Sequence, residues 1–135
     1  MTDDVTLNKS AIIRRCLARV DEEYGGDPAN LHHITRQDSI ILNIQRGWEA
    51  AIDLAMHVVS ERRLGLPQSS RNAFDLLEGA GVIDEQQAGR LRAGVGFRNL
   101  AVHNYEDIDL DILQHIVEGY LVNLTDFANA VMRLS

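Results

Sequence analysis

Apolar residues recur at steps of three and four along almost the whole chain, and this spacing constrains the fold more than any other feature. It is the spacing of one face of an α-helix. Alternating apolar and polar residues, which indicate strands, are almost absent. The clearest helical stripe follows Asp109, a residue type that caps helix starts, and consists of Leu110, Leu113, Val117, Leu121, Leu124, Ala128 and Val131. The sequence therefore predicts an all-α protein whose last helix carries this whole stripe.

Two long helices are expected in the first half of the chain. The first ends at the Gly-Gly-Asp-Pro of residues 25–28, and its apolar stripe is Leu7, Ile13, Leu17, Val20 and Tyr24. Thr35 and Asp38 have the spacing of a capping box, in which side chains bond free backbone N–H groups at a helix start. The helix that they would open runs to about Arg63, and its stripe is Ile41, Ile44, Trp48, Ile52, Ala55 and Val59.

Helix caps also divide the second half of the chain. Ser69 and Ser70 can cap a short helix. Asp84 and Gln87 form a second capping box, which opens a helix that runs to about Val102. Together with the helix after Asp109, this gives four main helices and a short fifth one. We expect an up-and-down helical bundle, formed by residues 1–135 as a single domain.

The charge of the chain restricts its partners. The net charge is −7, which argues against general binding to nucleic acids, because such binding depends on clustered positive charge. Twelve of the thirteen basic residues are arginine, and Lys9 is the only lysine. Arginine can grip phosphate or carboxylate with two bonds, although a GC-rich coding bias gives the same composition. An acidic protein can still bind RNA through a local patch, or bind a basic partner, and composition leaves both open.

Location and redox chemistry are constrained by what the sequence lacks. Cys16 is the only cysteine, so neither an intramolecular disulfide nor a cysteine metal site can form. No apolar run approaches the ~20 residues that a membrane span needs. The N-terminus, Met1 to Asp4, carries two acidic residues and lacks the basic-then-apolar layout of a signal peptide. We expect a cytoplasmic protein without membrane contact.

Arg98 departs from the apolar pattern of its helix. It follows Val95 by three residues and precedes Val102 by four, so it lies along an otherwise apolar edge. A guanidinium beside a core must be paired or must face a wet cleft, because an unpaired buried charge is very costly. One interpretation is a structural ion pair with an Asp or Glu of a neighbouring helix. The other is a functional site.

Three polar residues accompany Arg98. His103 follows it by five residues, which places the two side chains about 140° apart on an ideal helix. Their convergence on one small target therefore needs a helix end near Val102, or a second copy of the motif across a dimer interface. Asn99 lies four residues before His103, on the same face, and could orient the imidazole. Tyr105 lies just beyond, next to an acidic stretch.

These residue types suit the cleavage of a phosphodiester by the 2′-hydroxyl of the RNA itself. The reaction needs a base for that hydroxyl, an acid for the leaving 5′-oxygen and positive charge on the crowded phosphorus. Histidine titrates near neutral pH and can transfer the protons. Arg98 would supply fixed charge where negative charge develops, and Tyr105 could donate a hydrogen bond or stack on a base. No metal is needed.

The helix that carries Arg98 also has apolar residues on two sides. Phe97 and Leu100 point away from the main stripe, and glycines interrupt the helix at Gly89, Gly94 and Gly96. Glycine lets another chain segment come close, at a cost of ~1 kcal/mol against alanine in a helix. Either this helix packs on a second subunit as well as on its own bundle, or it is the central helix of a monomer. The sequence does not separate the two.

Residues 98–105, Arg-Asn-Leu-Ala-Val-His-Asn-Tyr, match the R-x4-H-x-Y motif of the HepT proteins, a branch of the HEPN superfamily. The chain also resembles this family outside the motif. Residues 38–46 are similar to the long second helix of the family, residues 64–71 to its helix-connecting turn, and residues 95–99 to the start of its motif.

The resemblance implies a helical dimer whose motifs lie near the dimer interface and cleave RNA without a metal or cofactor. It further implies the toxin of a two-gene toxin–antitoxin system. The antitoxin would be a minimal nucleotidyltransferase, similar to MntA, that transfers AMP from ATP onto the motif tyrosine. Carried over to this sequence, Arg98 and His103 are catalytic, Asn99 supports them and Tyr105 is both an active-site residue and the modified one. The RNA would be a transfer or messenger RNA.

Two other functions are compatible with the same sequence. The main alternative is a non-catalytic helical dimer that serves only as a binding partner of a nucleotidyltransferase, and a third is a bundle that binds a small molecule in a deep apolar pocket. His32, His33, His57 and His115 lack partners at metal-binding spacing and are expected to be ordinary surface residues. The acidic residues 106–111 are expected to cap a helix rather than to bind Mg²⁺.

Overall fold

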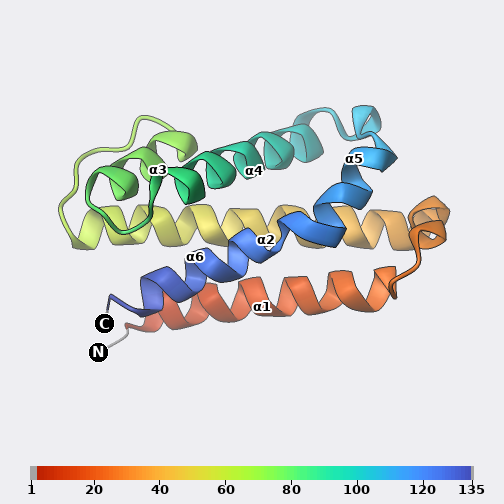
Figure 1. Ribbon diagram of the computed structural model, residues 1–135, viewed down its shortest axis with the longest axis horizontal. Coiled ribbons are helices and arrows are strands. Elements are labelled where there is room, and N and C mark those ends of the chain that lie inside the picture. The colour runs from red at the N-terminus through yellow and green to blue at the C-terminus, as the bar shows by residue number, and fades with distance from the viewer. Residues whose placement is uncertain (1–2, 135) are drawn as a thin grey trace.

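The computed structural model describes residues 3–134, and all regular structure in that range is helical (Figure 1). The α-helices are α1 (Asp4–Tyr24), α2 (Ile34–Glu61), α3 (Ser70–Gly79), α4 (Glu85–His103), α5 (Leu110–His115) and α6 (Val122–Met132). Shorter segments are the 3-10 turns η1 (Pro28–His32) and η2 (Tyr105–Asp107) and the π-helical η3 (Ile116–Tyr120). The predicted all-α class is confirmed.

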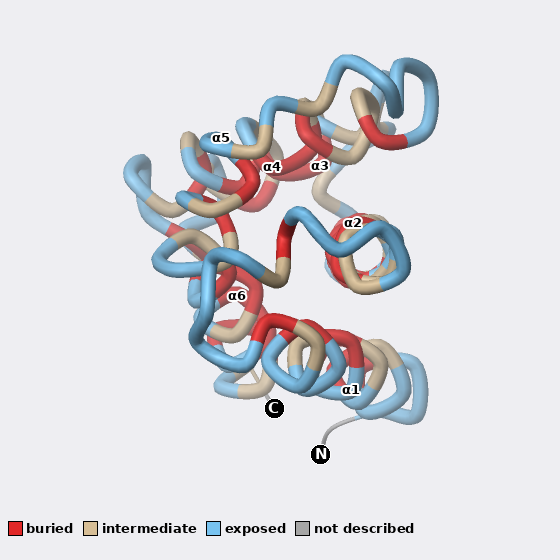
Figure 2. Tube along the Cα trace, turned by 90° about the vertical axis from the view of Figure 1, so that its right-hand side faces the viewer, coloured by how far each residue is buried: buried red, intermediate tan, exposed pale blue. Residues whose placement is uncertain are grey.

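Helix α2 is the centre of the bundle. It contacts α1, α3, α4 and α6. Figure 2 shows α2 end-on, with α1 below it, α3 and α4 above it and α6 to one side, while its remaining side faces solvent. Its predicted stripe is confirmed, since Ile41, Ile44, Trp48, Ile52, Ala55 and Val59 are all buried. One helix therefore organises the core and still presents an exposed face.

The start of α2 differs from the prediction. The helix begins at Ile34, and its N-cap residue, His33, makes no side-chain cap bond. Thr35 and Asp38 lie inside the helix, so the capping box predicted for them is wrong. The capping pattern is local, and at this position the carboxylate is used for a contact with a distant part of the chain.

In α1 the predicted stripe is only partly correct. Ile13, Val20 and Tyr24 are buried, and Gly25 ends the helix in the left-handed conformation, with φ 58°. Leu7 is instead exposed, while Thr6 and Ser10 are buried. Small polar residues can occupy the core-facing side of a helix, so hydropathy alone misplaced the first two turns.

The helix starts predicted in the second half are confirmed. Ser69 accepts a bond from the backbone N–H of Asn72, and Asp84 and Gln87 form the reciprocal capping box of α4. Helix α4 ends at His103, one residue after the predicted end at Val102, and Val102 is exposed rather than part of the apolar stripe.

The last helix is not continuous. The π-helical segment η3 separates α5 from α6, although Leu113, Leu121, Leu124, Ala128 and Val131 of the predicted stripe are buried. At the end of η3, the Tyr120 ring lies 6.3 Å from the Trp48 ring, between centroids, and its hydroxyl donates to the backbone oxygen of Arg90. A π turn fits one more residue into the helix than an α turn, a change that the apolar spacing does not reveal.

Within residues 3–134, none of the helices is long and apolar enough to cross a membrane.

Helices α2 and α4 approach each other closely in the core. The Trp48 ring is fully buried against Gly94, and a Cβ atom at Gly94 would lie 2.1 Å from its nearest ring atoms. No ordinary contact permits that distance, so alanine would force the tryptophan or the helix to move. The glycine predicted to allow a close approach does so within one chain.

We expect Gly94→Ala to lower the free energy of unfolding by about 1–3 kcal/mol, the range for an overpacked core, as measured by urea denaturation. Gly79→Ala is the matched control, because a Cβ atom there would meet nothing within 4 Å. It should leave stability unchanged or raise it by up to ~1 kcal/mol. Equal stability of the two variants would show that the Trp48 contact does not limit the approach of α2 and α4.

Candidate functional site

Arg98 projects from the penultimate turn of α4 and is held by neutral groups. Its Nε donates to Asn99 Oδ1 at 2.9 Å, and one terminal nitrogen lies 3.4 Å from Ser70 Oγ at the start of α3. Among residues 3–134 it forms no ion pair with a carboxylate. The structural Arg–carboxylate pair considered from the sequence is therefore wrong. The guanidinium is oriented and half-buried, and its charge is left uncompensated.

Asn99 has a different partner from the one that helical spacing suggested. Its side-chain oxygen accepts the bond from Arg98, and no bond between Asn99 and His103 is formed. His103 is exposed in the last turn of α4. Asn99 therefore supports Arg98 directly, and the expectation that it orients the imidazole is wrong.

The geometry of α4 keeps Arg98 and His103 apart. Because the helix continues through His103, five residues of helix separate the two, or about 140° of rotation. The helix does end near Val102, but only after His103, so both side chains still leave from regular helix. Within one chain, the two side chains leave the helix in different directions, and the second copy of the motif considered from the sequence stays a prediction.

Tyr105 reaches a residue that sequence reasoning did not assign to the site. It lies in η2, just after α4, and its hydroxyl donates to Oδ1 of Asp38 on α2. Burial raises the pKa of the Tyr105 phenol to about 12, and the neighbouring Asp38 carboxylate, which would repel a phenolate, adds to the rise. The two residues are 67 positions apart, so no local pattern joined them.

Phe97 and Leu100 line an apolar hollow between α4 and the α5–η3 segment. Its volume is about 300 Å³, and its other lining residues include Trp48, Ile112, Ile116 and Tyr120. Ile112 is 55% exposed. The second apolar side of α4 that the sequence indicated thus faces this hollow.

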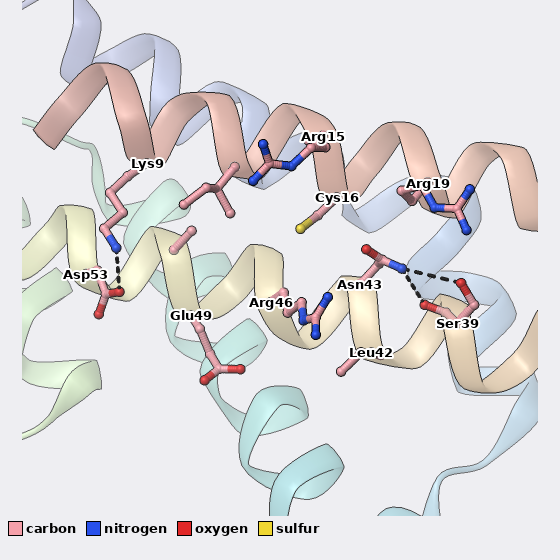
Figure 3. Close-up of a pocket in the computed structure, with 12 residues that line it drawn as sticks. Lys9, Arg15, Cys16, Arg19, Ser39, Leu42, Asn43, Arg46, Glu49 and Asp53 are labelled. Atoms are coloured by element: carbon pink, nitrogen blue, oxygen red, sulfur yellow. Dashed lines mark hydrogen bonds and ion pairs between the residues drawn. The ribbon is translucent and has the colours of Figure 1, made fainter. Parts of the chain in front are cut away.

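Positive charge gathers in a groove between α1 and α2 (Figure 3). The groove has a volume of about 690 Å³ and is lined by four basic residues, Lys9, Arg15, Arg19 and Arg46, against two acidic ones, Glu49 and Asp53. Lys9 pairs with Asp53, and Arg19 pairs with glutamates of its own helix. In the described part of the chain, Arg15 and Arg46 have no carboxylate partner. The acidic chain therefore does carry a local basic surface.

The remaining candidates have structural contacts. His57 Nε2 lies 3.0 Å from Asp3 Oδ2, and this bond is the main reason that the pKa of Asp3 falls to about 2. Asp109 accepts from the backbone N–H groups of Asp111 and Ile112, which confirms that it caps a helix. Across residues 3–134, no three His, Cys, Asp or Glu side chains are grouped so as to hold a metal ion.

The chain is similar to known proteins over nearly its whole length. The family described as "Ribonuclease HepT-like" matches residues 13–131. The mRNA nuclease HepT of Shewanella oneidensis (strain MR-1) is 40% identical over 129 residues, which cover 96% of this chain and 97% of that protein.

Two solved structures are similar over nearly the whole chain. One is a toxin–antitoxin with AMP-PNP, with a TM-score of 0.92 and 40% identity over 98% of this chain and 100% of that one. The other is a tri-AMPylated Shewanella oneidensis HEPN toxin in complex with an MNT antitoxin, with a TM-score of 0.92 and 40% identity over 99% and 100%. Fold, motif and sequence agree, and the chain belongs to the HepT-like family of HEPN ribonucleases.

Proposed function

We propose that the chain, as one domain over residues 1–135, is a metal-independent endoribonuclease toxin with Arg98 and His103 as its catalytic residues. The observation that carries the proposal is the state of Arg98. Its guanidinium is oriented by Asn99 and Ser70, both neutral, so its full charge is available to a phosphate. A similar relative is an mRNA nuclease, which favours a messenger RNA substrate.

The chemistry uses only groups of the protein and of the RNA. The 2′-hydroxyl oxygen attacks the adjacent phosphorus, the bond to the 5′-oxygen breaks, and a 2′,3′-cyclic phosphate forms. His103 transfers a proton at one of these two oxygens. Arg98 stabilises the negative charge that grows on the non-bridging oxygens. Asn99 keeps the guanidinium in place through its bond to Nε.

A dimer would complete this site. The two catalytic side chains diverge on one helix, and the apolar hollow beside α4 has exposed Ile112 at its edge. A second copy packed against this hollow would bury apolar surface next to the motif. It would also bring a second His103 and Arg98 to the same region, so that each RNA meets residues of both subunits.

The proposed regulation is adenylylation of Tyr105 by a nucleotidyltransferase antitoxin. A similar toxin is tri-AMPylated and in complex with an MNT antitoxin. Tyr105 follows His103 by two residues and is 39% exposed, so its hydroxyl can be reached from solvent. Attached adenylates would add bulk and negative charge beside the catalytic residues, and both oppose the binding of an RNA phosphate.

The basic groove between α1 and α2 offers a path for the RNA backbone. Ser39, the neighbour of Asp38 in the chain, lines it together with Arg15 and Arg46. Guanidiniums without carboxylate partners can exchange water for phosphate without first breaking an ion pair. This groove supplies positive charge that the net charge of −7 does not indicate.

We expect His103→Ala and Arg98→Ala each to lower the rate of RNA cleavage in EDTA by about 10²–10⁴-fold, the usual range for the loss of a proton-transfer or charge-stabilising group. His32→Ala and Arg14→Ala are matched controls on exposed positions outside the motif and should cleave at the native rate. Mass, thermal unfolding and dimer formation are measured for every variant.

The same experiment separates the two main functions. Native protein with an unmodified Tyr105 that does not cleave RNA would contradict the nuclease assignment and favour the non-catalytic dimer that binds a nucleotidyltransferase. Cleavage that survives both motif substitutions would place the catalytic groups elsewhere.

A double substitution, Arg15→Glu with Arg46→Glu, should weaken binding of a single-stranded RNA by at least about tenfold and flatten its dependence on salt, because two phosphate contacts are lost. Binding is measured on the His103→Ala background, so that the RNA stays intact. Arg14→Glu with Arg133→Glu makes the same change in net charge away from the groove. Equal weakening by both pairs would mean that only total charge matters.

A further inference from the structure

The contact between Tyr105 and Asp38 is not used by the nuclease chemistry. The tyrosine hydroxyl donates to the carboxylate, and within residues 3–134 the Asp38 side chain makes no other hydrogen bond and no ion pair. Asp38 is exposed on α2, so its charge is not required for the core. A carboxylate without a cation, placed on the oxygen of one tyrosine, is the arrangement expected of a proton acceptor.

The chemistry of adenylylation needs such an acceptor. A phenol must lose its proton as its oxygen bonds to phosphorus, and a neutral phenol is a weak nucleophile. Tyr105 stays neutral throughout the physiological range, because burial and the neighbouring carboxylate raise its pKa to about 12. Spontaneous ionisation therefore supplies very little phenolate, and a base in contact with the oxygen has to remove the proton during the attack.

We propose that Asp38 positions the Tyr105 hydroxyl and accepts its proton when the tyrosine is adenylylated, so that the toxin supplies part of the machinery for its own inactivation. The inference rests on the proposed function, because it takes Tyr105 as the modified residue. The Tyr105 oxygen bonds to the α-phosphorus of ATP, and the bond from that phosphorus to pyrophosphate breaks. The proton passes from the tyrosine oxygen to Asp38 Oδ1, and later to water.

The placement of Asp38 favours a role as proton acceptor over a role in which it only holds Tyr105 in position. It is fixed in the second turn of a long helix, so the carboxylate is held on a rigid element while Tyr105 lies in the short η2 turn. Tyr105 is 39% exposed, so the hydrogen bond lies at the surface and contributes little to stability.

The test compares Asp38→Asn, which keeps the shape and an acceptor oxygen but removes the base, with Asp38→Glu, which keeps the carboxylate. Asp126→Asn, an exposed carboxylate on α6, is the matched control. The purified antitoxin nucleotidyltransferase of the same system and Mg-ATP are added, and AMP on Tyr105 is followed by intact-mass and peptide mass spectrometry. Thermal unfolding is measured for each variant.

We expect Asp38→Asn to lower kcat for adenylylation at pH 7 by at least about 100-fold, with little change in the KM for ATP. Its rate should rise steeply with pH, because the reaction then depends on ionised phenol, whereas the native rate changes little. Asp38→Glu should recover part of the rate, and Asp126→Asn all of it. In ¹³C-labelled tyrosine spectra, the Tyr105 pKa should fall from about 12 towards 10 in Asp38→Asn.

Several outcomes would overturn the inference. Adenylylation of Asp38→Asn at the native rate would remove Asp38 from the step. Equal loss in the Asn and Glu variants with an unchanged pH profile would mean that the contact is a tether. Native protein that carries no AMP on Tyr105 would instead contradict the proposed regulation itself, and the inference would fall with it.

Discussion

The burial of Trp48 against Gly94 is the contact on which the rest of the structure depends. It fixes how closely and in what register α4 lies on the central helix α2, because any side chain at position 94 would collide with the ring. The two helices run in opposite directions (Figure 1). At about 1.5 Å per residue, Asp38 lies about 15 Å before Trp48 along α2, and His103 about 14 Å beyond Gly94 along α4. Both distances lead to the same end of the bundle, where Tyr105 meets Asp38. A packing contact in the core thus sets the position of the functional residues.

Most of the fold was predictable, because it depends on local rules. Apolar spacing predicted the helices. Three helix starts were predicted from the capping residues Ser69, Asp84 and Asp109, and all three starts are confirmed. The errors have a common cause: a local sequence pattern does not show which distant residues will pack against it. Thr6 and Ser10 are buried where Leu7 was expected. The π segment within the last helix is set by how the chain packs around Tyr120, whose ring lies beside Trp48 and whose hydroxyl bonds the backbone of α4. Neither of these Tyr120 contacts can be predicted from the spacing of apolar residues.

In the candidate site too, local sequence patterns predict some features, while others depend on distant contacts. The identities of Arg98, His103 and Tyr105 follow from the motif, but their surroundings do not. Helical spacing paired Asn99 with His103, whereas the amide bonds the residue next to it, Arg98. Asp38 was predicted to be part of a helix cap. Its bond to Tyr105 spans 67 residues, and no local sequence pattern indicates a contact over that separation. Residue types can be read from a motif, whereas their pKa values and free charges depend on neighbours that only the folded chain brings together.

Arg98 and Tyr105 differ in whether a carboxylate contacts them, and the difference has opposite consequences for their chemistry. Within residues 3–134, Arg98 has no carboxylate partner and is available to an external phosphate, whereas burial and the Asp38 carboxylate together keep the Tyr105 phenol neutral. Under the proposed function this contrast keeps the two activities separate. A free tyrosine carries no charge that would compete with RNA for the guanidinium, so the unmodified protein is not inhibited by its own switch. Attached adenylates would place phosphate two residues beyond His103, at the end of the motif helix. Because such a phosphate is covalently attached, it would oppose RNA binding without the entropy loss that a free RNA must overcome.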